Sequence, residues 1–269
     1  SYLQTDHEVV TFAYDWRRSI IDSAGLLAEE IEKKLNEIRD QPQRQVSILA
    51  HSMGGLVVRA MMTERADLWD KIVESGGHFV MLGTPNNGSH QMVETLLGKS
   101  SAIRQLAMLD FQHDLQEIID VVADYDGILQ LLPHDEFTDS GVEAAEKEGH
   151  DPLSYHQKAT WELIREENRD GWFSFKSKLG AKPLARKLNK TKEVWAKLNQ
   201  HNQEGGFTHA EKIAYVYGLA AHTPCGLTHT KETAGKCLHL HGTVQGDGSV
   251  SWKSGQLAGL QKDQYWYMP

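Results

Sequence analysis

The chain has 269 residues, of which 40% are hydrophobic and 24% charged, so it is long enough for one large α/β domain or for a core with an insertion. Its formal net charge of −9 argues against a general nucleic-acid-binding protein, which needs a basic face for phosphates, and small-molecule or lipid substrates fit better. No apolar run approaches the roughly 18 to 20 residues that span a bilayer, and no signal peptide opens the chain, so no localisation is indicated.

The first part of the chain predicts alternating strands and helices. Residues 9–14 are β-branched and aromatic and predict a buried strand, and apolar residues then recur at helical spacing over residues 20–38. Pro42 ends that helix, residues 46–50 predict a second strand, and residues 56–65 predict a second helix. This strand-helix order predicts a parallel sheet.

The predicted organisation is a core interrupted by a cap. Residues 79–82 predict a third strand, and residues 213–217 and 237–241 predict later ones. Between them, residues 93–205 show helical patterns without strand signals. We therefore expect an α/β core of residues 1–92 and 206–269 with an inserted, mainly helical cap or lid at residues 93–205.

The cap has two segments of opposite charge. Residues 110–151 carry thirteen acidic residues against one lysine, and residues 176–197 carry eight basic residues against one glutamate. One interpretation is that these are solvated faces that meet each other. Another is that Trp172, Phe173 and Phe175, followed by the basic run, contact anionic lipid headgroups.

Ser52 lies where a predicted strand passes into a predicted helix, with small residues two positions to either side, Ala50 and Gly54. Such a turn is typical of a nucleophile elbow, in which strained backbone lifts the serine hydroxyl clear of the sheet. The usual pattern has glycine where this chain has Ala50. The alternative is a glycine-rich helix entry with an incidental serine.

Asp247 is the candidate acid of a triad. A serine hydroxyl needs a histidine to accept its proton and a carboxylate to orient that histidine, and in this type of fold the order is serine, acid, histidine. Asp247 follows the late strands and lies between Gly246 and Gly248. An ordinary β-turn is the alternative, and a calcium loop fits less well because the rest of an EF-hand loop is missing.

These segments together resemble the lecithin:cholesterol acyltransferase-like α/β-hydrolases. The resemblance rests, in order and spacing, on Tyr14-Asp15-Trp16-Arg17, His51-Ser52-Met53-Gly54-Gly55, Leu82-Gly83-Thr84-Pro85 with Gly88-Ser89, and Gly246-Asp247-Gly248-Ser249-Val250. It implies a mostly parallel sheet flanked by helices and a serine esterase, lipase or acyltransferase without cofactor. It assigns the nucleophile to Ser52, the acid to Asp247 and half of the oxyanion hole to the backbone amide of Met53.

Two departures from the family pattern concern the ends of the chain. All fourteen histidines precede Asp247, whereas the family places its catalytic histidine after the acid, and no glycine-rich oxyanion loop precedes residue 9. We therefore expect both ends to be truncated, with the histidine beyond Pro269 in a longer polypeptide, and we expect this fragment alone to be inactive. His222 is the candidate for an internal base.

Cysteine and histidine residues in the last third leave further alternatives open. Cys225 and Cys237 could close a short disulfide loop or stay as free thiols. His239 and His241 would share one strand face, but no zinc-type spacing is present, so we predict no metal site.

Two functions stay open at the level of sequence. The first is hydrolysis or transfer of an acyl group from a lipid or carboxylic ester through an acyl-enzyme on Ser52, with the cap as a contact for membrane or lipid surfaces. The second is a catalytically incomplete domain that binds a lipid or a protein partner.

Overall fold

The computed structural model describes residues 7–110, 112–168, 178–203, 205–230 and 237–268. Its main sheet contains β1 (Ile48–His51), β2 (Phe79–Leu82), β4 (Ile213–Tyr217) and β7 (Tyr265–Tyr267), in the order β1-β2-β4-β7. Every neighbouring pair in this sheet is parallel. The predicted fold class, a mostly parallel sheet flanked by helices, is confirmed.

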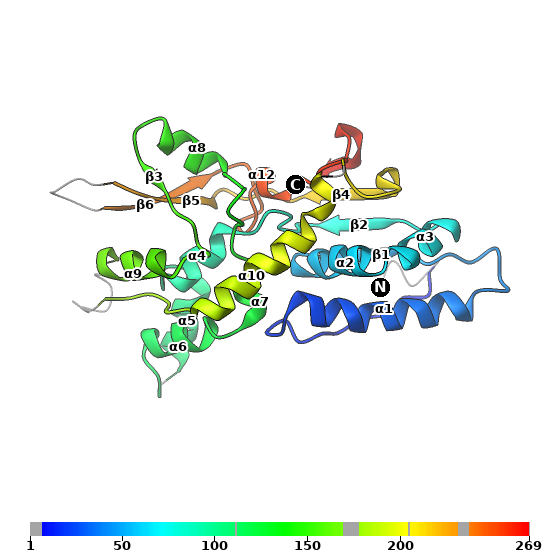
Figure 1. Cartoon of the computed structure of the whole chain (residues 1–269), viewed down its shortest axis with the longest axis horizontal. Coiled ribbons are helices and arrows are strands. Elements are labelled where there is room, and N and C mark those ends of the chain that lie inside the picture. Colours follow the sequence, from blue (N-terminus) through cyan, green and yellow to red (C-terminus); the bar gives the residue numbers. More distant parts are fainter. Residues whose placement is uncertain (1–6, 111, 169–177, 204, 231–236, 269) are drawn as a thin grey trace.

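Three helices pack together beside this sheet (Figure 1). They are α1 (Ile20–Glu37), α2 (Met53–Glu64) and α3 (Ala66–Glu74). Apolar residues of α1 at helical spacing form its buried face, and they join β1, β2, β4 and most of α2 in one hydrophobic core. The helix α2 is buried on nearly all sides because it lies between α1, the sheet and α10 (Ala185–Leu198).

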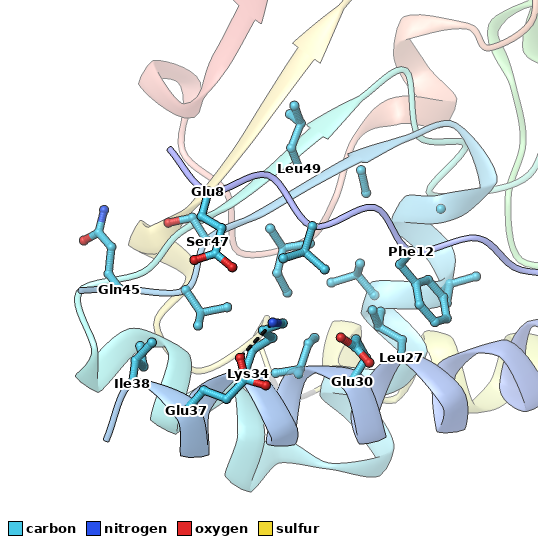
Figure 2. A pocket seen from close by; sticks show the side chains of 18 of the residues that line it. Glu8, Phe12, Leu27, Glu30, Lys34, Glu37, Ile38, Gln45, Ser47 and Leu49 are labelled. Atoms are coloured by element: carbon cyan, nitrogen blue, oxygen red, sulfur yellow. Dashed lines mark hydrogen bonds and ion pairs between the residues drawn. The ribbon is translucent and has the colours of Figure 1, made fainter. Parts of the chain in front are cut away.

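The predicted buried strand at residues 9–14 is wrong. This segment forms no strand pairing, and Val9 and Val10 are 41% and 48% exposed. Its apolar and β-branched side chains favour a strand, but a strand also needs a neighbour within hydrogen-bonding reach. A groove separates the segment from β1 (Figure 2), so that neighbour is missing.

Helices dominate the region between β2 and β4, as the sequence predicts. Most of them contribute to a second hydrophobic core that includes Trp161 and Tyr155. The helices are α4 (His90–Leu96), α5 (Ser101–Leu109), α6 (Leu115–Val122), α7 (Asp126–Leu129), α8 (Ser140–Glu146), α9 (Lys158–Glu167), α10 (Ala185–Leu198) and α11 (Gln200–Gln203). The division into a core and a cap at residues 93–205 stays a prediction. Within the described residues no helix is long and apolar enough to cross a membrane.

The acidic and basic segments of this region meet, as one interpretation predicts. Lys187 Nζ lies 2.9 Å from Asp124 and 3.3 Å from Asp126, and Lys190 Nζ lies 3.0 Å from Asp126. These pairs join α10 to α7 and the turn before it. The aromatic residues proposed for lipid headgroups, Trp172, Phe173 and Phe175, lie outside the described residues.

A small antiparallel sheet contains β3 (Asp151–Pro152), β5 (Thr223–His229) and β6 (Leu238–Thr243). The predicted strand at residues 237–241 therefore exists, but it pairs with β5 and not with the main sheet. Cys225 and Cys237 are not joined in a disulfide. The end of the described chain adds α12 (Trp252–Gly255) and two short 3₁₀ helices, Ala210–Lys212 and Lys262–Gln264.

Arg59 on α2 connects this helix to the loop after β2 and to the end of α10. Its side chain is fully buried, and its guanidinium donates to the backbone oxygens of Asn86 and Leu198, both at 2.8 Å. Leu198 is the last residue of α10, where the free carbonyl groups of the helix favour a cation. No carboxylate is paired with Arg59 among the described ion pairs, and burial lowers the pKa of Arg59 to about 9.

We expect Arg59→Met to lower the free energy of unfolding by about 3 kcal/mol or more, because it leaves buried carbonyl oxygens without a donor. Thermal denaturation of the variant measures this loss. Arg39→Met is the matched control, since Arg39 is exposed and should change stability by less than about 0.5 kcal/mol. Equal melting temperatures for the two variants would contradict the role of Arg59.

His134 belongs to the same buried region. Its Nε2 lies 3.1 Å from Asn87 Oδ1 and 3.2 Å from Asn199 Nδ2. Burial, with a smaller contribution from the charge of Arg59, lowers the pKa of His134 to about 4. The folded protein therefore holds this ring neutral at neutral pH.

His134 should make stability fall in acid. The pKa of this histidine in the unfolded chain is near 6.5. Between about pH 6.5 and pH 4 the unfolded chain therefore binds a proton that the folded chain does not bind, and the free energy of unfolding falls as the pH falls through this range. The loss attributable to this group between pH 7 and pH 5 is about 2 kcal/mol. His134→Gln should flatten the dependence of the melting temperature on pH over that interval, and an unchanged slope would contradict this assignment.

Candidate active site

Ser52 stands between β1 and α2 in an unusual backbone conformation. Its φ is 52° and its ψ is −128°, and only His209 shares a positive φ among the non-glycine residues described. Such a conformation costs a non-glycine residue about 1–3 kcal/mol and persists only where the surroundings impose it. Here the surroundings include a 2.8 Å hydrogen bond from the Ser52 N–H to the Leu82 carbonyl.

The tightest packing next to Ser52 is at Gly55 and not at Gly54. A Cβ atom on Gly54 would lie 3.7 Å from the Ala50 Cβ, which is an ordinary contact. A Cβ atom on Gly55 would lie only 2.0 Å from Thr84 Oγ1, and Thr84 is completely buried. The close approach that requires glycine is therefore at Gly55, where the start of α2 packs on the loop after β2.

Gly55→Ala should destabilise the fold by about 1–3 kcal/mol, because the new methyl group overlaps the Thr84 side chain. Gly54→Ala is the matched control, since its methyl group meets only ordinary contacts and alanine favours a helix by up to about 1 kcal/mol. Chemical denaturation of both variants compares the two positions. A loss for Gly54→Ala as large as that for Gly55→Ala would contradict the packing argument.

Met53 is the first residue of α2, and its side chain is buried against Gly127 of α7. Backbone N–H groups in the first turn of a helix have no partner within the helix, and the helix dipole makes this end attractive to negative charge. The Met53 amide therefore belongs to a helix end that can donate to an oxygen near Ser52.

Asp247 is held at the ends of two other strands of the main sheet. Its Oδ1 accepts hydrogen bonds from the N–H groups of Ser249 at 2.9 Å and Val250 at 2.8 Å. A Cβ atom on Gly83 would lie 2.6 Å from Asp247 Oδ2, and one on Gly218 would lie 2.8 Å from Asp247 Cβ. Glycine at both positions, after β2 and β4, lets the aspartate pack there.

The sheet brings Ser52 and Asp247 to one edge. Ser52 follows β1, and Asp247 packs on the residues that follow β2 and β4, which are the next two strands in order. Since neighbouring strands are about 4.8 Å apart, the two side chains are separated by one to two strand spacings, or ~5–10 Å. Sites in open parallel sheets form at this carboxyl edge.

No histidine is hydrogen-bonded to Ser52 or to Asp247 in the part of the chain that the structure describes. His51 is exposed at the end of β1. His222, the candidate internal base, is exposed in the loop between β4 and β5, and its ring packs over Gly242 of β6. Thus the structure gives neither residue a contact with the serine.

Other residues that the sequence singles out have structural contacts. Asn86 donates to the Gly255 carbonyl at 2.8 Å, and the Thr84 carbonyl accepts from the Tyr215 hydroxyl at 2.8 Å. Asp15 and Arg17 form an exposed ion pair at 2.8 Å, which lowers the pKa of Asp15 to about 2. Among the described residues no group of three histidine, cysteine or acidic side chains is arranged to hold a metal ion.

Comparisons with known proteins identify the family and the fold. The model of the family described as lecithin:cholesterol acyltransferase matches residues 3–212 of the chain. No curated protein matches its sequence.

One solved structure shares the fold at low sequence identity. A chain in "The crystal structure of Tle4-Tli4 complex" is 16% identical, with a TM-score of 0.51, and the match covers 90% of this chain and 57% of that one. A second match, the mature Bacillus licheniformis lipase BlEst2, is 12% identical with a TM-score of 0.37, and covers 93% of this chain and 67% of that one. The chain spans little more than half the length of the first of these.

Proposed function

The chain belongs to the lecithin:cholesterol acyltransferase family, and from this premise we propose that it carries the nucleophile of a serine lipase, esterase or acyltransferase. The substrate class is a lipid or carboxylic ester. The acyl group would pass to Ser52 as an acyl-enzyme and then to water or to an alcohol. No cofactor takes part in this chemistry.

The observation that carries the proposal is the backbone of Ser52. A positive φ at a serine between a parallel strand and a helix is costly, and strain of this kind is concentrated at functional sites. Ser52 follows β1 and directly precedes α2, which supports this role. In the proposed reaction the Met53 N–H donates to the oxyanion of the tetrahedral intermediate.

Asp247 is the proposed acid. Two backbone N–H groups hold its Oδ1, and the charge on Oδ2 faces the sheet edge, where it could orient and stabilise an imidazolium. A separation of ~5–10 Å between Ser52 and Asp247 leaves space for an imidazole ring between them. The general base is the one role to which we assign no residue.

We also propose that the helical region contacts a membrane or lipid surface. Leu106, Met108 and Leu109 at the end of α5 are 50%, 59% and 76% exposed, which is unusual for large apolar side chains close together. Such residues can insert into the headgroup region of a lipid aggregate. Because the chain spans 57% of one solved chain of this fold, contacts with further domains are part of the proposal.

A second candidate function is a binding module that keeps the fold without the chemistry. The observation that favours it is that the described residues hold no histidine in contact with Ser52. This candidate predicts association with lipid vesicles and no release of fatty acid.

The test measures release of fatty acid from phosphatidylcholine vesicles and of nitrophenol from p-nitrophenyl butyrate. We expect acyl release from a polypeptide that continues past Pro269, where the catalytic histidine is expected, and from its Ser101→Ala variant, which changes an exposed serine on α5, but not from its Ser52→Ala variant. An added long-chain alcohol separates transfer from hydrolysis, since transfer yields a new ester. Vesicle binding with no acyl release from that longer polypeptide would support the binding module and overturn the enzyme.

A further inference from the structure

Asp139 is a buried carboxylate to which the proposed reaction gives no role. It directly precedes α8, and its side chain and that of His90 on α4 are both almost completely buried. His90 Nδ1 lies 3.3 Å from Asp139 Oδ2, at ion-pair distance but without the alignment of a hydrogen bond. No lysine or arginine is paired with Asp139 among the described ion pairs. Because removing a carboxylate from water is costly, its burial here calls for an explanation.

The two oxygens of Asp139 have separate partners. Oδ1 accepts a hydrogen bond from the N–H of Ser140 at 2.7 Å, and in this way Asp139 caps α8. Oδ2 accepts a hydrogen bond from the Ser251 hydroxyl at 2.7 Å, although Ser251 is 112 residues further along the chain. A helix cap needs only one of these oxygens, and a serine would supply it. The second oxygen is therefore committed to the contact with Ser251.

Ser251 closes the turn that holds Asp247. Gly246 and Ser251 form an antiparallel bridge, and the Asp247 N–H donates to the Val250 carbonyl at 3.2 Å. Val250 directly precedes Ser251, and its N–H donates to Asp247 Oδ1 at 2.8 Å. The position of Ser251 therefore sets the position of a donor that orients the Asp247 carboxylate.

The start of α8 is a firm support for this contact. A Cβ atom on Gly141 would lie 2.7 Å from Cys225 Sγ, so the first turn of α8 packs closely on β5. The His90 ring packs edge-on against Tyr155, with 5.7 Å between the ring centroids. Because these contacts leave Asp139 little room to move, its carboxylate is a fixed acceptor. Hydrogen bonds to a charged acceptor are about twice as strong as those between neutral groups.

We propose that Asp139 is a positioning residue for Asp247. Its carboxylate holds the Ser251 hydroxyl, and with it the turn of residues 246–251, so that Asp247 keeps the orientation in which it acts on the catalytic histidine. This inference rests on the proposed function, because it requires Asp247 to be the acid. It also makes a residue of the helical region part of the support for the acid.

The test measures hydrolysis of p-nitrophenyl butyrate by a polypeptide that continues past Pro269. Ser251→Ala removes the hydroxyl that Asp139 holds. Asp139→Ser keeps one oxygen to cap α8 and loses the second, so it provides the same measurement if Ser251→Ala does not fold. The matched controls are Ser100→Ala and Asp114→Ser, since Ser100 is a buried serine that caps α5 and Asp114 caps α6.

We expect Ser251→Ala and Asp139→Ser to lower kcat about 10- to 100-fold with KM changed less than about twofold, because a small displacement of a catalytic group has an effect of this size. The acid limb of the pH profile of kcat/KM should move to lower pH by about 0.5 unit or more. This limb reports the catalytic histidine, whose pKa a well-oriented carboxylate raises. The two controls should lower the melting temperature and leave kcat and the acid limb unchanged.

A double variant shows whether Ser251 acts through Asp247. In the Asp247→Asn background, Ser251→Ala should cause no further loss of kcat, because the group that it positions is already disabled. A further loss as large as that in the wild-type background would overturn the inference, since Ser251 would then act independently of Asp247.

Two other results separate this inference from the proposed function. Wild-type kcat and an unmoved acid limb in both Ser251→Ala and Asp139→Ser, together with an impaired Asp247→Asn, would overturn the inference alone. Full activity of Asp247→Asn would overturn the proposed role of Asp247 itself, and the inference with it.

Discussion

In a polypeptide that continues past Pro269 and so includes the expected histidine, replacement of Ser52 by alanine should lower kcat for ester hydrolysis by about a million-fold, the loss found when the nucleophile of a serine hydrolase is removed. The hydroxyl is the group that would bond to the acyl carbon, so no neighbouring side chain can replace it. The turn itself should survive, because alanine meets the same backbone constraint at a φ of 52° as serine does. Kinetics with p-nitrophenyl butyrate and a thermal melt measure the two effects separately.

Ser52→Gly is the informative companion variant. Glycine adopts a positive φ at little cost, so the free energy of unfolding of this variant should be about 1 kcal/mol higher than that of the wild-type protein. Its activity should be as low as that of Ser52→Ala. Greater stability with lost activity would link the strain at Ser52 to its function. Hydrolysis by Ser52→Ala at the wild-type rate would contradict the assignment of the nucleophile.

Replacement of Asp247 by asparagine should lower kcat by about 10⁴-fold with little change in stability. The asparagine oxygen can still accept the hydrogen bonds from Ser249 and Val250 that hold the turn. The negative charge at the second oxygen is lost, and with it the group that would orient the histidine and stabilise its charged form.

Asp247→Ala separates the two roles of this side chain. It removes the charge and also the two hydrogen bonds, so it should lower both kcat and the melting temperature. Full activity of Asp247→Asn, together with a lower melting temperature of Asp247→Ala, would show that Asp247 only stabilises the turn. This is the ordinary β-turn that the sequence offers as the alternative.

Local patterns predict much of this fold. The strand at residues 79–82 and the one at residues 213–217 were predicted at their observed bounds, because continuous β-branched and aromatic runs between turn residues are typical of buried parallel strands. The helix predicted at residues 20–38 is observed as Ile20–Glu37. In each of these segments local preference and tertiary packing agree.

Pairing partners could not be predicted in the same way. Residues 9–14 have the composition of a strand, yet whether they pair depends on a neighbour that the local sequence does not specify. Likewise, β6 alternates in the sequence like any strand, but its pairing with β5 depends on how the chain turns back after residue 229.

The candidate site was predictable where a motif carries it. Ser52 and Asp247 are recognised by their glycine-rich turns and by their order along the chain. The contact between Gly55 and Thr84 and the burial of Arg59 join residues about 30 or more positions apart, and nothing local marks them. An arginine within an otherwise apolar run of α2 is the one signal that could have indicated a buried charge.

The most direct test of the account is covalent labelling of the protein by a fluorophosphonate, with the modified residue identified by mass spectrometry of its peptides. For a polypeptide that continues past Pro269, where the catalytic histidine is expected, the account predicts an adduct on Ser52, little labelling of Asp247→Asn, and none of Ser52→Ala. An adduct confined to other serines, or equal labelling of Ser52→Ala and wild type, would contradict the claim that Ser52 is the nucleophile.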